Sequence, residues 1–115
     1  MALGTSKTFE LLNATTSTGL GTITDIRGTE FLDIELTGMN IVATVTKVSV
    51  QGSVYGTTFT TVTVVRRDTN VASDTMSNNA IYSLDVGALG YIRLNVYRYN
   101  TASTPTAVGQ GINYI

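Results

Sequence analysis

Apolar and polar residues alternate with a period of two along most of this chain. The segment Tyr91–Tyr99 shows this most clearly. Its even-numbered positions 92, 94 and 96 are Ile, Leu and Val, whereas its odd-numbered positions 93, 95 and 97 are Arg, Asn and Tyr. The segment Glu30–Thr37 repeats the pattern. Successive side chains of a strand point to opposite faces, so the alternation predicts strands with one buried face. No window shows the i, i+3, i+4, i+7 spacing of an amphipathic helix.

Turn-forming residues separate these segments about every 8–12 positions, as in all-β domains. We expect strands at Thr8–Thr15, Gly21–Ile26, Glu30–Thr37, Ile41–Val50, Thr57–Arg66, Ala80–Val86, Tyr91–Tyr99 and Gly109–Ile115. No helical segment lies between them, which disfavours a parallel α/β sheet. The sequence therefore predicts an all-β fold, a single antiparallel β-sandwich domain over residues 1–115 that is jelly-roll-like with about eight strands.

The stretch Val50–Val62, VQGSVYGTTFTTV, interrupts β-branched runs with two glycines. Such a stretch is either a loop that binds a ligand or a turn that joins two strands. Glycine adopts positive φ without strain, so Gly56 can close a hairpin between the flanking strands. We interpret the stretch mainly as this hairpin. Tyr55 would then lie at an exposed tip with no structural role, which makes it a candidate contact residue.

The chain contains no cysteine and no histidine. Disulfides, thiolate metal sites and Cys–His or Ser–His–Asp catalytic groups are therefore excluded within the chain. Charged residues make up 13% and the formal net charge is −1, so the basic surface that nucleic acids require is missing. Low charge gives weak repulsion between copies, and threonine-rich edge strands invite pairing. Both features indicate a protein assembled with copies of itself or with a partner.

The first residues, MALGTSKTFELL, lack the basic start and the apolar run of a signal peptide. No apolar stretch approaches the roughly 20 residues of a membrane-spanning helix. We therefore expect a protein that is made in the cytoplasm of its producer and has no membrane partner.

Carboxylates cluster once, at Asp25, Glu30, Asp33 and Glu35. Asp33 and Glu35 share a strand face, so their side chains would lie about 7 Å apart along the strand. Such a pair could bind a hard cation or serve glycoside hydrolysis, or it could simply be a solvated outer face. The solvated face is favoured, because nothing in the sequence supplies the raised pKa or the aromatic cleft that a glycosidase needs. We accordingly expect no enzyme, and no catalytic, cofactor-binding or metal-binding residues.

The polar parity of Tyr91–Tyr99 carries several aromatic and polar side chains that would point outward. Together with the hairpin tip they form a candidate interface of Tyr55, Tyr91, Arg93, Asn95, Tyr97 and Tyr99. Tyrosine and arginine are enriched in protein interfaces because they supply much contact area. A sugar-binding face and ordinary cross-strand pairs are the alternatives, and the chain has no tryptophan for a sugar platform. Arg98 has the parity of the core, so we expect it at the strand end, where it reaches solvent.

Three segments resemble small β-sandwich virion proteins of tailed bacteriophages and prophages: Leu11–Gly38, Val48–Val62 and Tyr82–Gly111. In that family a Gly–Thr-rich start precedes a strand, a Gly-Ser-x-Asp-Gly-Thr-Thr hairpin follows, and a Tyr-(Ile/Val)-Arg strand comes last. The segments keep this order over most of the chain. Tyr55 stands where the hairpin often has aspartate, and Phe59 stands where tryptophan is common.

The resemblance implies a non-enzymatic structural protein of the virion, without a cofactor. It would be a capsid decoration or cement protein, or another head-associated protein, acting through many copies. Its partners would be itself, for instance as a trimer, and other virion proteins such as the major capsid protein. The alternative is a carbohydrate-binding adhesin module of a phage tail or fibre, with a glycan as partner.

Overall fold

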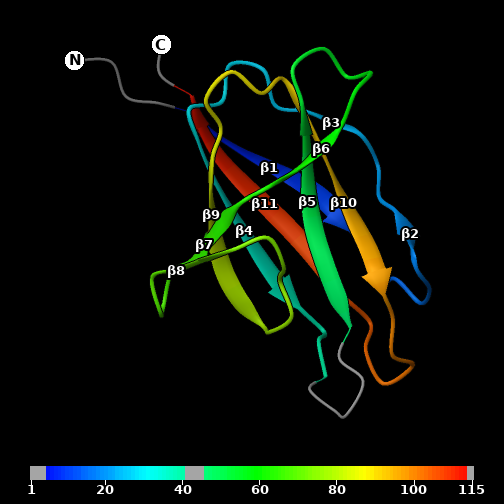
Figure 1. Ribbon diagram of the computed structural model, residues 1–115. Helices are drawn as coiled ribbons and strands as arrows, with labels where there is room; N and C mark the ends of the chain where they lie inside the picture. Colours follow the sequence, from blue (N-terminus) through cyan, green and yellow to red (C-terminus); the bar gives the residue numbers. More distant parts are fainter. Residues whose placement is uncertain (1–4, 41–45, 114–115) are drawn as a thin grey trace.

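The computed structural model describes residues 5–40 and 46–113, and these fold into two antiparallel sheets that face each other (Figure 1). The larger sheet has the order β1 (Thr5–Leu12), β11 (Thr106–Asn113), β4 (Phe31–Thr37), β9 (Ala80–Asp85), β7 (Val64–Arg66) and β8 (Val71–Ser73). The smaller sheet has the order β2 (Gly19–Leu20), β10 (Tyr91–Arg98), β5 (Lys47–Ser53) and β6 (Thr60–Val62), and β3 (Thr24–Asp25) also pairs with β10. The predicted antiparallel sandwich is confirmed.

The core lies between the two sheets and follows from the alternation along the strands. On β4 the buried side chains are Leu32, Ile34 and Leu36, and on β10 they are Ile92, Leu94 and Val96. Each such aliphatic side chain contributes about 1.5–3 kcal/mol when it leaves water, so burial of one face drives the two sheets together. The inward parity predicted for both strands is therefore confirmed.

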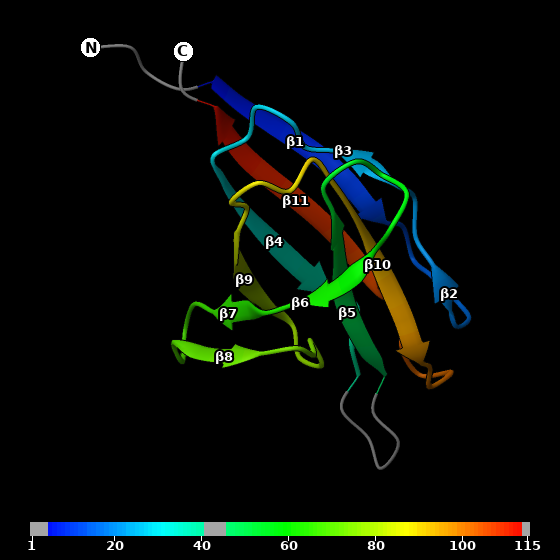
Figure 2. The same ribbon diagram turned by 45° about the horizontal axis from the view of Figure 1, so that its top comes forward.

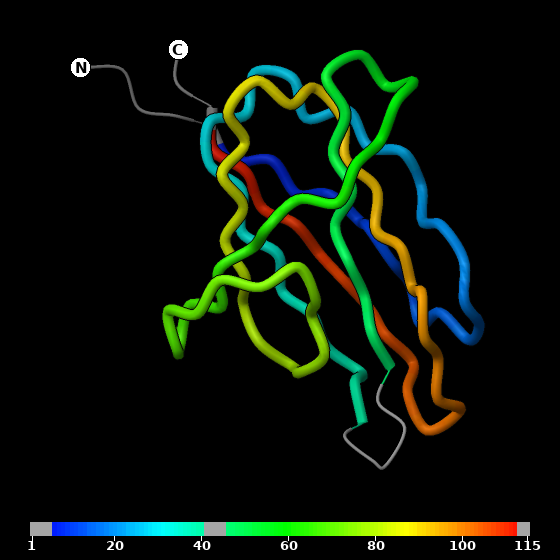
Figure 3. Tube along the Cα trace, viewed as in Figure 1, coloured from blue at the N-terminus to red at the C-terminus, as the bar shows by residue number. Residues whose placement is uncertain are grey.

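The first and last strands of the chain pair with each other. Thr5 lies opposite Asn113, and the register continues along the two strands to Glu10 opposite Val108. Figure 3 shows these two segments side by side. In Figure 2, β7 and β8 of the same sheet lie at the side of the molecule away from β2. The first and the last described strands thus belong to one sheet.

Several element boundaries differ from the prediction. The expected strand Thr57–Arg66 is two strands, β6 and β7, because the chain passes from the smaller sheet to the larger one at Thr63. The expected strand Gly21–Ile26 is replaced by the short strands β2 and β3. The last strand begins at Thr106 rather than Gly109. Of the expected strand Ile41–Val50, residues 41–45 lie outside the described residues.

Strand β8 was not predicted from the sequence. All three of its residues are exposed, so it has no burial alternation that a pattern could reveal. Pairing with β7 alone holds it at the end of the larger sheet. In the part of the chain that the structure describes, there is no helix long and apolar enough to cross a membrane.

Candidate functional site

The outer face of the smaller sheet carries most of the predicted interface. Tyr91, Arg93, Asn95 and Tyr97 point away from the core along β10, since the residues between them are buried. Arg93 lies opposite Gln51 of β5, and its Nε donates a hydrogen bond of 2.8 Å to Gln51 Oε1. This cross-strand pair holds the guanidinium of Arg93 over the outer face of the smaller sheet.

The β5–β6 hairpin folds over one end of this face. Its turn glycine, Gly56, has φ +86°, and a Cβ placed there would lie 3.2 Å from the ring of Tyr91. Further along, the guanidinium carbon of Arg93 lies 4.1 Å from the ring centroid of Phe59. A second cation–π contact, of 5.2 Å, places Arg27 over Tyr91. Tyr91 and Arg93 therefore have structural partners within the chain and are only partly accessible.

Tyr99 does not share this face, so that part of the prediction is wrong. The pairing of β10 with β5 shifts between Val96 and Arg98, which places Arg98 opposite Lys47. The extra residue of such a β-bulge reverses the parity of everything beyond it. Tyr99 consequently packs against the core, and its hydroxyl donates a hydrogen bond of 2.7 Å to the Ser103 carbonyl. Arg98 is exposed, as predicted.

The hairpin tip and the far half of β10 remain open to solvent. Tyr55 is 85% exposed at the tip, in agreement with its predicted position, and Tyr97 is 46% exposed. Beside Tyr97 the outer face forms a groove of about 350 Å³, here called the β5–β10 groove. Its lining residues are Ser49, Thr61, Asp74, Thr75, Asn95 and Tyr97. The six predicted interface residues thus do not form one surface. Tyr91 and Arg93 are partly covered, Asn95 and Tyr97 line the groove, Tyr55 lies at the hairpin tip, and Tyr99 packs against the core.

The outer face of the larger sheet combines apolar and acidic side chains. The exposed apolar residues are Phe31, Ile81, Val108 and Ile112, with exposed fractions between 37% for Val108 and 59% for Phe31. The carboxylates that lie beside or between them are Glu10, Asp33, Glu35 and Asp85. Ile112 lies directly opposite Phe31, so two of the apolar side chains are neighbours across β11 and β4.

This second face was not among the predicted sites, although the sequence carries its signal. Phe31 is adjacent to the buried Leu32, and Ile81 is adjacent to the buried Tyr82. Both therefore have the outward parity of their strands, where a polar residue is the norm. Several apolar residues at outward positions of neighbouring strands are the feature that indicates a contact surface.

The predicted carboxylate cluster is divided between the two sheets. Asp25 lies on β3 of the smaller sheet, whereas Asp33 and Glu35 lie on the outer face of β4. Asp33 accepts a hydrogen bond of 2.8 Å from the Ser83 hydroxyl and pairs with Arg67 at 3.2 Å. Within the described residues, no three carboxylates gather in a way that would hold a metal ion.

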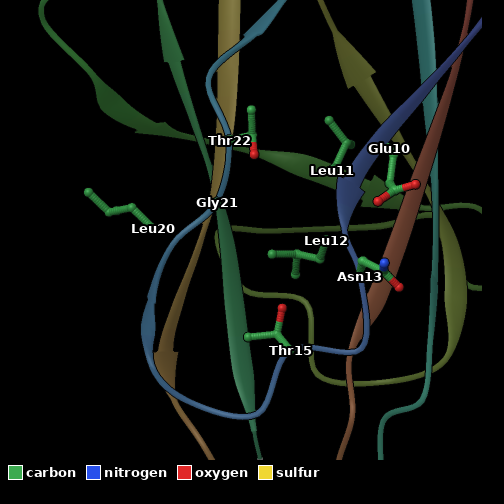
Figure 4. Close-up of a pocket in the computed structure, with 8 residues that line it drawn as sticks. All are labelled: Glu10, Leu11, Leu12, Asn13, Thr15, Leu20, Gly21 and Thr22. Atoms are coloured by element: carbon green, nitrogen blue, oxygen red, sulfur yellow. The ribbon is translucent and has the colours of Figure 1, made fainter.

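A shallow cleft of about 210 Å³ lies where β1 and the segment through β2 meet at one side of the sandwich (Figure 4). Leu12 points into this space, whereas Leu20 points away from it. A Cβ on Gly21 would lie 3.3 Å from Leu12 Cδ2, so the side chain of Leu12 lies close to the backbone at Gly21. Glu10 is the only ionisable residue of the lining, which offers no acid–base pair.

Two solved structures have the same fold as this chain. The SPBc2 prophage-derived protein YomS matches with a TM-score of 0.84 and 14% sequence identity, over 98% of this chain and 97% of YomS. The PBSX exported protein XepA matches with a TM-score of 0.81 and 15% identity, over 96% of this chain but 38% of XepA. This chain thus corresponds to nearly all of YomS and to about two fifths of XepA. No family model and no curated protein sequence matches it. At these identities the likeness shows the fold.

Proposed function

We propose that this chain is a non-enzymatic structural protein of a tailed-phage particle, a decoration or other head-associated protein that acts through multi-copy protein contacts. The observation that carries the proposal is the outer face of the larger sheet, with its four exposed apolar side chains. The shared fold with the prophage-derived YomS and with XepA supports the association with a phage. The resemblance of the sequence to virion proteins points the same way.

The sheet edges are poorly suited to pairing with another chain, contrary to what the threonine-rich edge strands suggested from the sequence, and this favours assembly through a face. Strands β2, β6 and β8, which lie at edges, have two or three residues each. The long edge strand β1 has a register shift between Glu10 and Leu12. Short and bulged edge strands resist pairing with another chain. Contacts with neighbouring proteins would therefore be made by side chains on a face rather than by an added strand.

The chemistry of this face defines the partner. Exposed apolar side chains interspersed with carboxylates fit a protein surface that presents both apolar and basic side chains. Two copies joined symmetrically through the same face would bring two acidic surfaces together. Copies would therefore contact each other through two different surfaces, or they would not contact each other directly and a capsid lattice would position them side by side.

The experiment compares two single substitutions in particles from a phage whose own copy of the gene is deleted. Ile81→Lys places a charge on this face in place of an exposed apolar side chain, whereas Val71→Lys places the same charge on the exposed edge strand β8. We expect occupancy on the particle, measured by cryo-electron microscopy and protein staining, to fall about tenfold for Ile81→Lys, as for an interface residue that loses its apolar contact. Val71→Lys should bind like the wild type.

Two results would contradict the proposal. One is a particle that assembles without ever incorporating the wild-type chain. The other is normal occupancy of Ile81→Lys when circular dichroism shows that the variant is folded. Light scattering then measures the molecular mass of the free protein. An oligomer means that copies associate by themselves, whereas a monomer means that a capsid lattice positions them.

A further inference from the structure

We propose that the β5–β10 groove on the outer face of the smaller sheet binds a neutral saccharide. This goes beyond the proposed structural role and concerns a different surface. The groove lies on the smaller sheet, whereas the apolar and acidic face belongs to the larger sheet on the other side of the core. One surface can therefore hold the chain on a particle while the other remains open to a ligand.

The lining of the groove consists of groups that bind hydroxyls. Ser49, Thr61 and Thr75 contribute hydroxyls, Asn95 an amide and Asp74 a carboxylate, and Tyr97 supplies the single aromatic ring. Hydroxyl and amide groups both donate and accept hydrogen bonds, and a carboxylate accepts them, as a ring of sugar hydroxyls requires. The lining contains no Leu, Ile, Val or Met side chain, and its apolar surface belongs to residues that also carry polar groups, which suits a sugar with both C–H faces and hydroxyls.

Two of these groups have unused hydrogen-bonding capacity. Ser49 is 4% exposed and its side chain faces the groove, yet its hydroxyl makes no hydrogen bond to any described residue. The half-buried amide of Asn95, which lies directly opposite Ser49 on β10, also has no partner among the described residues. Buried polar groups are nearly always paired with protein or with water. A neighbouring donor and acceptor pair at the floor of an open groove is therefore available to a ligand hydroxyl.

The walls of the groove are held in place before any ligand arrives. The hydroxyls of Tyr97 and Thr75 share a hydrogen bond of 2.5 Å, which fixes the tyrosine ring at the rim. Asp74 accepts a hydrogen bond of 2.9 Å from Thr63 through Oδ1, which leaves Oδ2 for a ligand. Tyr97 is 46% exposed, and its ring can pack against the apolar C–H face of a sugar. Preorganised walls reduce the ordering that binding requires.

The charge and the size of the groove narrow the ligand class. One carboxylate is too few for a calcium ion, which takes six to eight oxygen ligands. The same carboxylate repels anionic ligands such as phosphates. A volume of about 350 Å³ is at the small end of ligand sites, which suits a monosaccharide or the terminal unit of a glycan.

The test is ligand-observed saturation-transfer NMR on the full chain with glucose, galactose, mannose, rhamnose and N-acetylglucosamine as probes. We expect saturation transfer from the protein to at least one of these sugars, with a dissociation constant in the millimolar range. Asn95→Leu, which replaces the free amide with an aliphatic group, should weaken that binding about tenfold. The matched control is Tyr55→Ala, which removes an exposed tyrosine outside the groove and should leave binding unchanged.

Asp74→Ala provides a second variant at an exposed position, in case Asn95→Leu fails to fold, and it should show the same loss. The proposal is overturned if none of the five sugars shows saturation transfer at tens of millimolar. It is equally overturned if the folded Asn95→Leu and Asp74→Ala variants bind like the wild type. Ile81→Lys should retain sugar binding, so the outcome is independent of the proposed role in the particle.

Discussion

Four arginines of this chain each contact a nearby side chain, and these contacts determine how much local charge the surface carries. Arg27 pairs with Asp25 at 2.7 Å, and Arg66 pairs with Asp68 at 2.6 Å, each two residues apart along the chain. Arg67 reaches Asp33 on another strand, whereas Arg93 stacks on a phenyl ring. The ion pairs are exposed and add little stability by themselves. Their effect is to neutralise charge locally, which leaves most of the surface weakly charged.

Asp25 provides the first prediction at this scale. The side-chain hydrogen bond from Arg27 lowers the pKa of Asp25 from 3.8 to about 2. Because the folded pKa is below the unfolded one, the pair stabilises the folded chain above about pH 4, and this contribution is lost as the pH falls through about 2. We expect an NMR titration of the Asp25 carboxyl carbon to give a midpoint near 2.

The control for this titration is Arg27→Gln, which should return the Asp25 midpoint towards 3.8. The pKa of Asp68, which Arg66 lowers in the same way, should not respond to that substitution. A midpoint near 3.8 in the wild type would show that the Arg27 guanidinium does not hold Asp25 in solution.

At the scale of elements, the β5–β6 hairpin and strand β10 decide which predicted residues are accessible. The hairpin brings Gly56 against Tyr91 and Phe59 against Arg93, so these contacts close one end of the outer face. The bulge at the other end turns Tyr99 towards the core. Of the predicted interface residues, only Asn95 and Tyr97 line the β5–β10 groove, because they lie between the hairpin and the bulge.

The contact of Phe59 with Arg93 gives a prediction at the element scale. We expect a double-mutant cycle of Phe59→Leu and Arg93→Gln, measured by urea unfolding, to give a coupling energy of about 0.5–1 kcal/mol, as for other partly exposed cation–π pairs. The matched cycle replaces Arg98 instead of Arg93, because Arg98 is exposed near the other end of the same strand. Equal coupling in both cycles would mean that the ring does not interact with Arg93 specifically.

The alternation of residues predicted the long strands well, and it failed where pairing partners change. Strands β4, β9 and β10 were predicted to within one residue at each end, because each has a continuous buried parity. The division at Thr63 and the bulge in β10 depend on which sheet or strand lies alongside. A local pattern contains no information about that neighbour, so these two features needed the tertiary structure.

At the scale of the whole molecule, the chain closes on itself through β1 and β11. Strand β11 lies between β1 and β4 and pairs with both, so the larger sheet is complete only when the C-terminal strand is in place. Its Ala107 is fully buried in the core. Pairing between the two ends of a chain has a large loop-closure entropy, so such folds form slowly.

We therefore expect a chain that ends at Pro105 and lacks β11 to be unfolded, because β1 loses its partner strand and β4 becomes an edge. Far-UV circular dichroism should show a disordered spectrum without a cooperative thermal transition. The control is a circular permutant that joins the two ends with a glycine-rich linker and opens the exposed loop between Ser17 and Thr18. It keeps every described strand and should fold. A folded truncated chain would contradict this account.

The sequence by itself determined the class of fold, the parity of the core and the absence of histidine and cysteine chemistry. These depend on composition and on near neighbours along the chain, because the alternation of side chains is a local property of a strand. The tertiary structure alone decided which outward side chains are covered. A hairpin laid over Tyr91 and Arg93 and a bulge before Tyr99 both arise from contacts between segments that the local alternation does not contain.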